Sequence, residues 1–104
     1  MRAAGSPAPV RVGGMILGVF EETEFEQVEI NLESGDCLVL LTDGLIEVPE
    51  SGGKRPGLPR VLDALVRARE LTAQRQAEAL TADVLQRGAA RVHDDMTTFV
   101  LKRP

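Results

Sequence analysis

Three carboxylates lie where the sequence predicts the ends of two strands. Asp43 follows the apolar run 37–41, and Asp94 and Asp95 precede the β-branched segment 96–102, MTTFVLK. If these strands are antiparallel neighbours, the three carboxyl groups share one edge of a sheet. Like charges 4 Å apart repel by roughly 4 kcal/mol per pair at an effective dielectric of 20. A bound proton would relieve that repulsion, and a divalent cation that prefers oxygen ligands, Mg²⁺ or Mn²⁺, would relieve it better.

A simpler interpretation of the same residues is a pair of turns. Asp-Gly and Asp-Asp are common in turns, where Asp bonds its own backbone and Gly takes positive φ, and on spacing alone this interpretation is favoured. Neighbouring candidates add little, because a lone loop histidine such as His93 is usually solvated. Cys37 lies in an apolar strand and is interpreted as a small core residue.

The first half of the chain predicts strands joined by turns. Residues 1–14 are rich in Ala, Gly and Pro and are expected to be irregular, with a short edge strand at 10–12. Segment 15–20, MILGVF, predicts a buried strand weakened by Gly18. Segment 27–33, QVEINLE, alternates strictly and predicts a half-buried strand. The turn residues 34–36, Ser-Gly-Asp, then predict an antiparallel hairpin with a fully covered strand 37–41.

Two helices are predicted between the loop 49–57 and the final strand. Apolar residues recur at helical spacing first in Leu58, Val61, Leu62, Leu65 and Val66, and then in Ala77, Leu80, Thr81, Val84 and Leu85. Pro59 suits a first turn, Thr72 is the expected N-cap, and Gly88 is the expected stop. The order of strands, two helices and a strand predicts an α+β domain with both helices packed on one face of an antiparallel sheet.

Composition excludes several classes of protein. A chain of 104 residues supports one domain, and its 43% apolar content is ordinary for a globular protein. A net charge of −4 without a basic stripe, together with only three aromatic residues, disfavours nucleic acid as a partner. A single cysteine fits a reducing cytoplasm, and no apolar run approaches the roughly 18 residues of a membrane span.

Three separated segments resemble one family, the metal-dependent 2C-type (PPM) serine/threonine protein phosphatases in their bacterial SpoIIE-like, sigma-factor-regulating branch. The segments are 16–20 (ILGVF) with its Gly18, 32–48 (LESGDCLVLLTDGLIEV) and 93–101 (HDDMTTFVL). A lone Thr-Asp-Gly is weak evidence. Gly-Asp, an apolar strand, Thr-Asp-Gly, two helices and then Asp-Asp-Met-Thr, in that order and at that spacing, is specific.

The resemblance implies a β-sandwich flanked by helices, with a two-metal centre that activates water to attack a phosphoserine or phosphothreonine. It implies that Asp43 and Asp94 are ligands of Mn²⁺ or Mg²⁺, that Asp95 has a supporting role, and that Gly44 lets the chain turn beside the metal. No further catalytic residue is implied. The implied substrate is a phosphorylated regulatory protein of the anti-sigma-factor-antagonist type in the cytoplasm, with no nucleic acid or membrane partner.

The chain also departs from the family pattern. Residues 1–104 resemble a single partial domain, and the first metal-binding Asp-Gly pair of the family has no counterpart here, so we expect the first half of the domain to be absent. Three carboxylates supply at most three negative charges against the four positive charges of two divalent ions, which favours one cation. A catalytically inactive binding module or a gene fragment is therefore the alternative. An uncovered sheet face would favour self-association or pairing with another chain.

Overall fold

The computed structural model describes residues 1–46, 57–86 and 96–104. In chain order these contain strand β1 (Cys37–Leu41), the short helix α1 (Asp43–Ile46), helices α2 (Gly57–Arg67) and α3 (Ala73–Gln86), and strand β2 (Thr98–Lys102). The α+β class expected from the sequence is confirmed in this form. No helix in these ranges is both long and apolar enough to cross a membrane.

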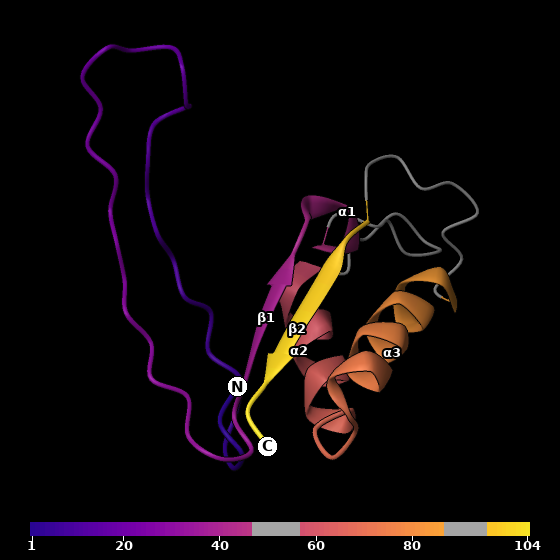
Figure 1. Cartoon of the computed structure of the whole chain (residues 1–104). Coiled ribbons are helices and arrows are strands. Elements are labelled where there is room, and N and C mark those ends of the chain that lie inside the picture. Colours follow the sequence, from indigo (N-terminus) through magenta and orange to yellow (C-terminus); the bar gives the residue numbers. More distant parts are fainter. Residues whose placement is uncertain (47–56, 87–95) are drawn as a thin grey trace.

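The two strands form an antiparallel pair. Cys37 lies opposite Lys102 and Leu41 opposite Thr98, so the end of β1 meets the start of β2. Figure 1 shows the two longer helices on one side of this pair, as the sequence predicted. Val39 and Leu41 pack against the core on that side. The predicted full coverage of this strand is wrong, because Leu40 on the other face is 55% exposed.

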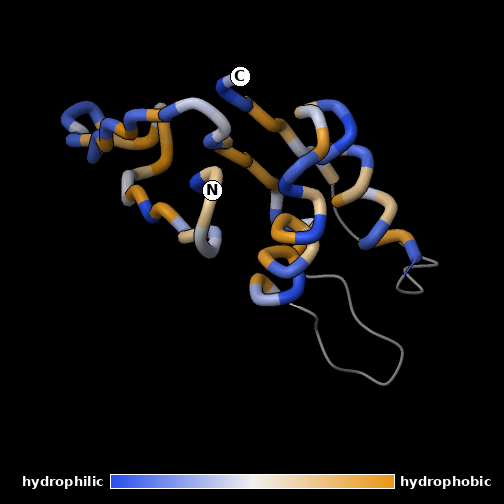
Figure 2. The backbone as a smooth tube through the Cα atoms, turned by 90° about the horizontal axis from the view of Figure 1, so that it is seen from below, coloured by the Kyte–Doolittle hydropathy of each residue, from blue (hydrophilic) through white to orange (hydrophobic). Residues whose placement is uncertain are grey.

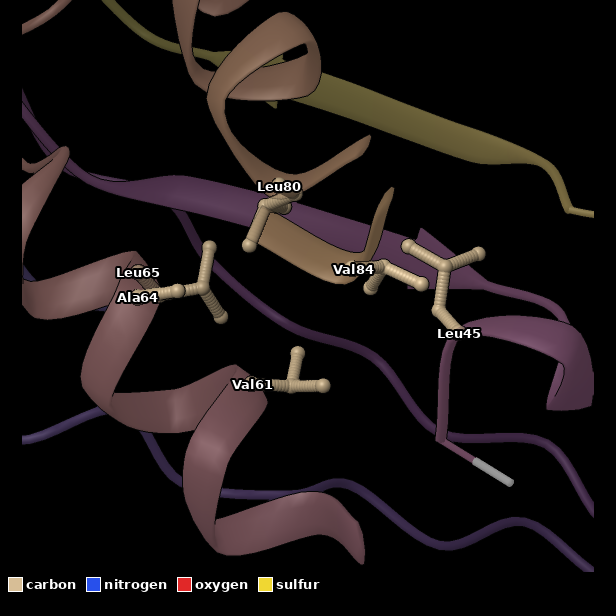
Figure 3. Close-up of a cluster of buried hydrophobic side chains, with 6 residues drawn as sticks. All are labelled: Leu45, Val61, Ala64, Leu65, Leu80 and Val84. Carbon is tan, nitrogen blue, oxygen red and sulfur yellow. The ribbon is translucent and has the colours of Figure 1, made fainter. Parts of the chain in front are cut away.

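The core lies between the two longer helices and β1. Its buried members come from three helices and converge in Figure 3: Leu45, Val61, Ala64, Leu65, Leu80 and Val84. The packed stripe is narrower than the periodicity predicted, since Val66 is 43% and Leu85 50% exposed. Apolar spacing locates a helix face, but the neighbouring element decides how much of that face is covered.

The connection between α2 and α3 is held by polar contacts. The predicted N-cap is confirmed: Thr72 Oγ1 accepts a hydrogen bond from Arg75 N at 3.3 Å. The buried Gln76 donates from Nε2 to the carbonyls of Ala68 and Arg69 at the end of α2. Lys102 Nζ of β2 donates to the same Arg69 carbonyl at 2.9 Å, which ties the sheet to both helices. The predicted stop at Gly88 lies outside the described residues.

The first 36 residues differ most from the prediction. They are irregular, so the strands expected at 10–12, 15–20 and 27–33, and the hairpin with β1, are wrong. Gly18 has φ +81° in a turn, where a strand was predicted. Val28 is 50% and Ile30 39% exposed. Alternation predicts which face a strand would bury, but a strand also needs a neighbour for its backbone hydrogen bonds, and these residues have none in the described chain.

The start of the chain is nevertheless fixed to β1. Met1 and Cys37 exchange two backbone hydrogen bonds, one of them from Cys37 N to Met1 O at 2.8 Å. The predicted turn before β1 is present, with Gly35 at φ +85° and Asp36 N donating to Glu33 O at 3.0 Å. Between these anchors, residues 8–31 form an extended loop that stands apart from the helices in Figures 1 and 2. We call it the N-terminal arm.

Candidate functional site

The ends of the two strands meet at Thr42 and Thr97. Thr42 N donates to Thr97 O at 3.1 Å, and Thr97 N donates to the hydroxyl Oγ1 of Thr42 at 2.9 Å. These bonds extend the antiparallel ladder one pair beyond β1 and β2. The carbonyl of Thr42 instead accepts a bond from Leu45 N at 3.1 Å, which begins α1. Thr42 is therefore the point at which the chain changes from strand to helix.

Asp43 is the first residue of α1, and its side chain is exposed. It stands between two fixed neighbours, since Thr42 is bonded to Thr97 and Leu45 is only 1% exposed in the core. This arrangement holds the backbone of Asp43 while leaving its carboxylate accessible. A carboxylate in that position is a suitable oxygen ligand for Mg²⁺ or Mn²⁺.

Gly44 is buried and lies within α1. The turn interpretation of Asp43-Gly44 predicted positive φ at this glycine, but the glycines with positive φ in the described ranges are Gly5, Gly18, Gly35 and Gly57. The chain turns here by starting a helix, which needs no left-handed residue. Because Gly44 is buried, the backbone that follows Asp43 packs against the rest of the molecule.

The other predicted site residues, Asp94 and Asp95, lie outside the described residues, as does His93. Their separation from Asp43 is therefore untested. Within residues 1–46, 57–86 and 96–104, no cluster of three or more His, Cys, Asp or Glu side chains could hold a metal ion. Of the two predicted ligands, Asp43 and Asp94, the structure therefore describes Asp43, together with the strand ends next to it.

Two features escaped the sequence-based prediction. One is the Thr42 hydroxyl, whose only signal was a threonine between a strand and an aspartate. The other is Asp36 at the opposite end of β1, a carboxylate that is 3% exposed. It accepts bonds from the Arg2 guanidinium at 2.6 Å, Ala3 N at 2.7 Å and Glu33 N at 2.9 Å. These bonds, that from Arg2 first, lower the pKa of Asp36 from 3.8 to about 2. Asp36 therefore fastens the start of the chain and is not part of the strand-end site.

A groove of about 460 Å³ runs between β1, α2 and residues 6–10. Its lining is mainly apolar, with Arg2 as its one charged residue. The groove does not include Asp43. It therefore lacks the acidic ligands of a divalent cation, and the strand ends remain the candidate metal centre.

The sequence matches a known family along its whole length. The family model described as Stage II sporulation protein E (SpoIIE) matches residues 1–104. The chain belongs to the SpoIIE family. The resemblance inferred from residues 32–48 and 93–101 is thereby confirmed.

Two SpoIIE-family relatives show how much of a longer protein the chain represents. It is 29% identical over 92 residues to the phosphoserine phosphatase RsbU of Bacillus subtilis (strain 168), an alignment that covers 86% of this chain and 27% of RsbU. It also resembles the phosphatase domain of the Bacillus subtilis cell fate determinant SpoIIE, in a structure presoaked with manganese. That match has a TM-score of 0.55 and 25% identity, and it covers 83% of this chain and 39% of the other. The chain thus spans well under half of either relative, and its fold matches part of the phosphatase fold.

Proposed function

We propose that this chain is the C-terminal, metal-binding part of a SpoIIE-type serine/threonine phosphatase, in which Asp43 and Asp94 hold Mn²⁺ or Mg²⁺. The observation that carries the proposal is the antiparallel pairing of β1 with β2, continued by Thr42 and Thr97. The carboxylates are expected to share one edge of the sheet if the two strands are antiparallel neighbours. The pairing of β1 with β2 meets that condition. Family membership and the manganese-presoaked relative support the same proposal.

The covalent chain limits how far Asp94 can lie from the strand ends. Asp94 lies three positions before Thr97, and three residues span at most about 11 Å even when fully extended. Thr97 is hydrogen-bonded to Thr42, the residue next to Asp43. Chain length therefore permits Asp43 and Asp94 to bind one cation, and Asp95 is close enough in sequence to assist.

The proposed roles follow from the chemistry of these residues. Asp43 and Asp94 each supply oxygen ligands and one negative charge, while the Thr42 hydroxyl and buried Leu45 hold Asp43 in place. Gly44 keeps the neighbouring backbone compact. A cation bound there would neutralise phosphoryl oxygens and lower the pKa of water in the site. The protein would position the bound cation where the phosphate ester binds.

The proposed substrate is a phosphoserine or phosphothreonine on a cytoplasmic regulatory protein of the anti-sigma-factor-antagonist type. The name of RsbU as a phosphoserine phosphatase supports the phosphoserine part of this proposal. In this chain the proposed site would lie just after β1, where Asp43 is exposed and accessible to a protein surface. A phosphorylated side chain can reach such a site without entering a deep pocket.

The test is release of inorganic phosphate from a phosphoserine protein by the purified chain, with and without Mn²⁺. We expect Mn²⁺-dependent release that falls on the order of 100-fold or more in Asp43→Asn and in Asp94→Asn, because each variant loses a ligand charge. Asp63→Asn is the matched control, since Asp63 is an exposed aspartate on α2 that has no proposed part in metal binding. Absence of Mn²⁺-dependent release from the wild-type chain would contradict an activity of this chain.

A non-catalytic binding module is the second candidate function. The observation that favours it is the amount of exposed apolar surface outside the helices, including Phe99 at 54% and Leu17 at 80%. A module of this kind would form its complex equally well with Asp43→Asn and Asp94→Asn. Loss of phosphate release in these variants without loss of complex formation separates catalysis from binding.

A further inference from the structure

One edge of strand β1 has no neighbouring strand in the described chain. Along a strand, successive residues direct their backbone N–H and C=O groups to opposite edges. Thr42 N donates to Thr97 O at 3.1 Å, so the N–H of Thr42 points toward the β2 side. The groups of Cys37, Val39 and Leu41 therefore point away from β2. We call the side to which they point the outer edge of β1.

Met1 occupies the first position on the outer edge. It exchanges two backbone hydrogen bonds with Cys37, which is the bonding pattern of a residue pair in an antiparallel sheet. Val39 and Leu41, further along the same edge, have no backbone hydrogen-bond partner there among the described residues. Each of them presents one unpaired N–H and one unpaired C=O, in the two-residue repeat that an added strand requires.

The groove of about 460 Å³ runs along this outer edge. Its lining includes residues 38–41 of β1, Leu58 and Leu62 of α2, and residues 6–10 together with Ile30. Figure 1 shows the same arrangement, because β1 is the strand next to the N-terminal arm and β2 is the strand next to α3. The unpaired backbone groups and the apolar groove therefore belong to one place in the fold.

The unpaired backbone groups indicate the chemical class of the occupant. An aliphatic ligand would fill the apolar groove but would leave these N–H and C=O groups without partners, which costs free energy once water is displaced. An extended polypeptide supplies matching C=O and N–H groups at the same spacing. Arg2 is the one charged side chain in the lining, and it is paired with Asp36 at 2.6 Å. The groove therefore favours an uncharged, extended polypeptide segment.

The segment of this chain that lines the groove is poorly suited to that place. Residues 6–10 make no backbone hydrogen bond to β1. Pro7 and Pro9 in this segment lack the amide hydrogen that a strand donates to its neighbour.

We propose that the groove binds an extended, uncharged segment of a partner polypeptide, which pairs with Val39 and Leu41 antiparallel to β1. This segment continues the line that Met1 begins at Cys37, and its side chains lie in the apolar groove. Asp43 is not part of the groove lining. The proposal therefore goes beyond the phosphatase function and does not depend on it.

Amide hydrogen exchange of single residues, followed by nuclear magnetic resonance, tests this proposal. In the free chain, Leu38 and Leu40 point toward β2, and their amides should exchange about tenfold or more slowly than those of Val39 and Leu41. The probe is the capped synthetic peptide KVTVTVK. At ten times the dissociation constant found by titration, it should slow exchange at Val39 and Leu41 about tenfold, because only the free chain exchanges there.

A modified peptide separates backbone pairing from apolar contact. The control peptide has the same sequence but is methylated on two adjacent central amide nitrogens, which removes a donor from each edge of the strand. We expect it to bind at least about tenfold more weakly, because a hydrogen bond is lost and an acceptor on β1 stays unpaired.

Two variants of the chain locate the binding site. Leu40 and Leu101 lie on the same face of the sheet and are 55% and 49% exposed, but Leu40 lines the groove and Leu101 does not. Leu40→Glu should weaken peptide binding at least about tenfold, because the carboxylate would lose water in the filled groove. Leu101→Glu is the matched control and should bind the peptide as the wild type does. Circular dichroism checks that both variants are folded.

Four results would overturn the proposal. They are slow exchange at Val39 and Leu41 in the free chain, no binding of the peptide up to about 5 mM, equal binding of the methylated peptide, and equal affinity of Leu40→Glu and Leu101→Glu for the peptide. A second copy of the chain on the outer edge would give the first result, with exchange rates that depend on the concentration of the chain.

Discussion

The hydroxyl of Thr42 takes the hydrogen bond that its carbonyl would accept in a regular antiparallel ladder. Thr97 N donates to Oγ1, and the carbonyl accepts the first bond of α1 from Leu45 N. The strand can therefore end and a helix begin within one residue. Asp43 is placed at that junction as a result.

Replacing Thr42 with Val tests this positioning role. The substitution keeps the shape of the side chain but leaves Thr97 N without its acceptor, so Asp43 should be less well ordered. We expect Mn²⁺ affinity to fall about tenfold. This is the smaller end of the loss of metal affinity expected when a group that supports a metal ligand is removed. Thr42→Ser, which keeps the hydroxyl, should restore it. Equal affinity in Thr42→Val and the wild type would show that the hydroxyl does not position the site.

Asp36 makes the stability of the chain depend on acid. Its hydrogen bonds, above all from Arg2, lower the pKa from 3.8 to about 2 in the folded state. The folded chain therefore binds fewer protons there than the unfolded chain does. The stabilisation is complete above pH 3.8 and is lost as the pH falls toward 2.

We accordingly expect the urea midpoint of the wild type to fall between pH 4 and pH 2, beyond any general acid effect. Asp36→Asn should be less stable than the wild type at pH 6 and should show a shallower decline over the same window. Asp63→Asn provides the exposed-aspartate control. A decline in Asp36→Asn as steep as in the wild type would assign the acid sensitivity to other groups.

Helices α2 and α3 depend on a narrow stripe of buried side chains. Leu80 is 2% exposed in the core, while Leu85, predicted from the same periodicity, is 50% exposed. We expect Leu80→Ala to lower the free energy of unfolding by about 2–5 kcal/mol, because it leaves a cavity. Leu85→Ala should change it by no more than about 0.5 kcal/mol, as at other exposed sites. Denaturant unfolding measures both, and equal effects would contradict the packing described here.

Periodicity and capping residues predicted β1, β2, α2 and α3, because each has both a local pattern and a partner in the described chain. The alternating segment 27–33 has the pattern of a strand, but among the described residues no strand lies beside it to pair with. The same limitation applies to 15–20, where Gly18 forms a turn at positive φ. Local sequence specifies which side chains could be buried. It does not specify the neighbour that buries them.

The candidate site was predictable to a similar extent. The order Thr-Asp-Gly, two helices and Asp-Asp-Met-Thr identified the family, which the match over residues 1–104 confirms. The position of Asp43 at the end of β1 followed from the apolar run before it. The role of the Thr42 hydroxyl could not be predicted from the sequence, because a threonine hydroxyl after a strand has many alternative hydrogen-bond partners. The proximity of Asp43 and Asp94 remains a prediction.

At the scale of the molecule, the described residues form a well-packed helical side, and exposed apolar side chains lie on the N-terminal arm and on the strand residues Leu40, Phe99 and Leu101. The core of α2, α3 and β1 buries Leu45 and so holds the backbone next to Asp43.

Direct binding of Mn²⁺ is the measurement that tests the strand-end site most closely, with loss of the free-ion signal in electron paramagnetic resonance as the readout. The wild-type chain and Asp63→Asn should bind Mn²⁺ with the same affinity. Asp43→Asn and Asp94→Asn should each bind at least about tenfold more weakly, because either change removes one ligand charge. If both variants bind Mn²⁺ as tightly as the wild type does, Asp43 and Asp94 do not form the metal site.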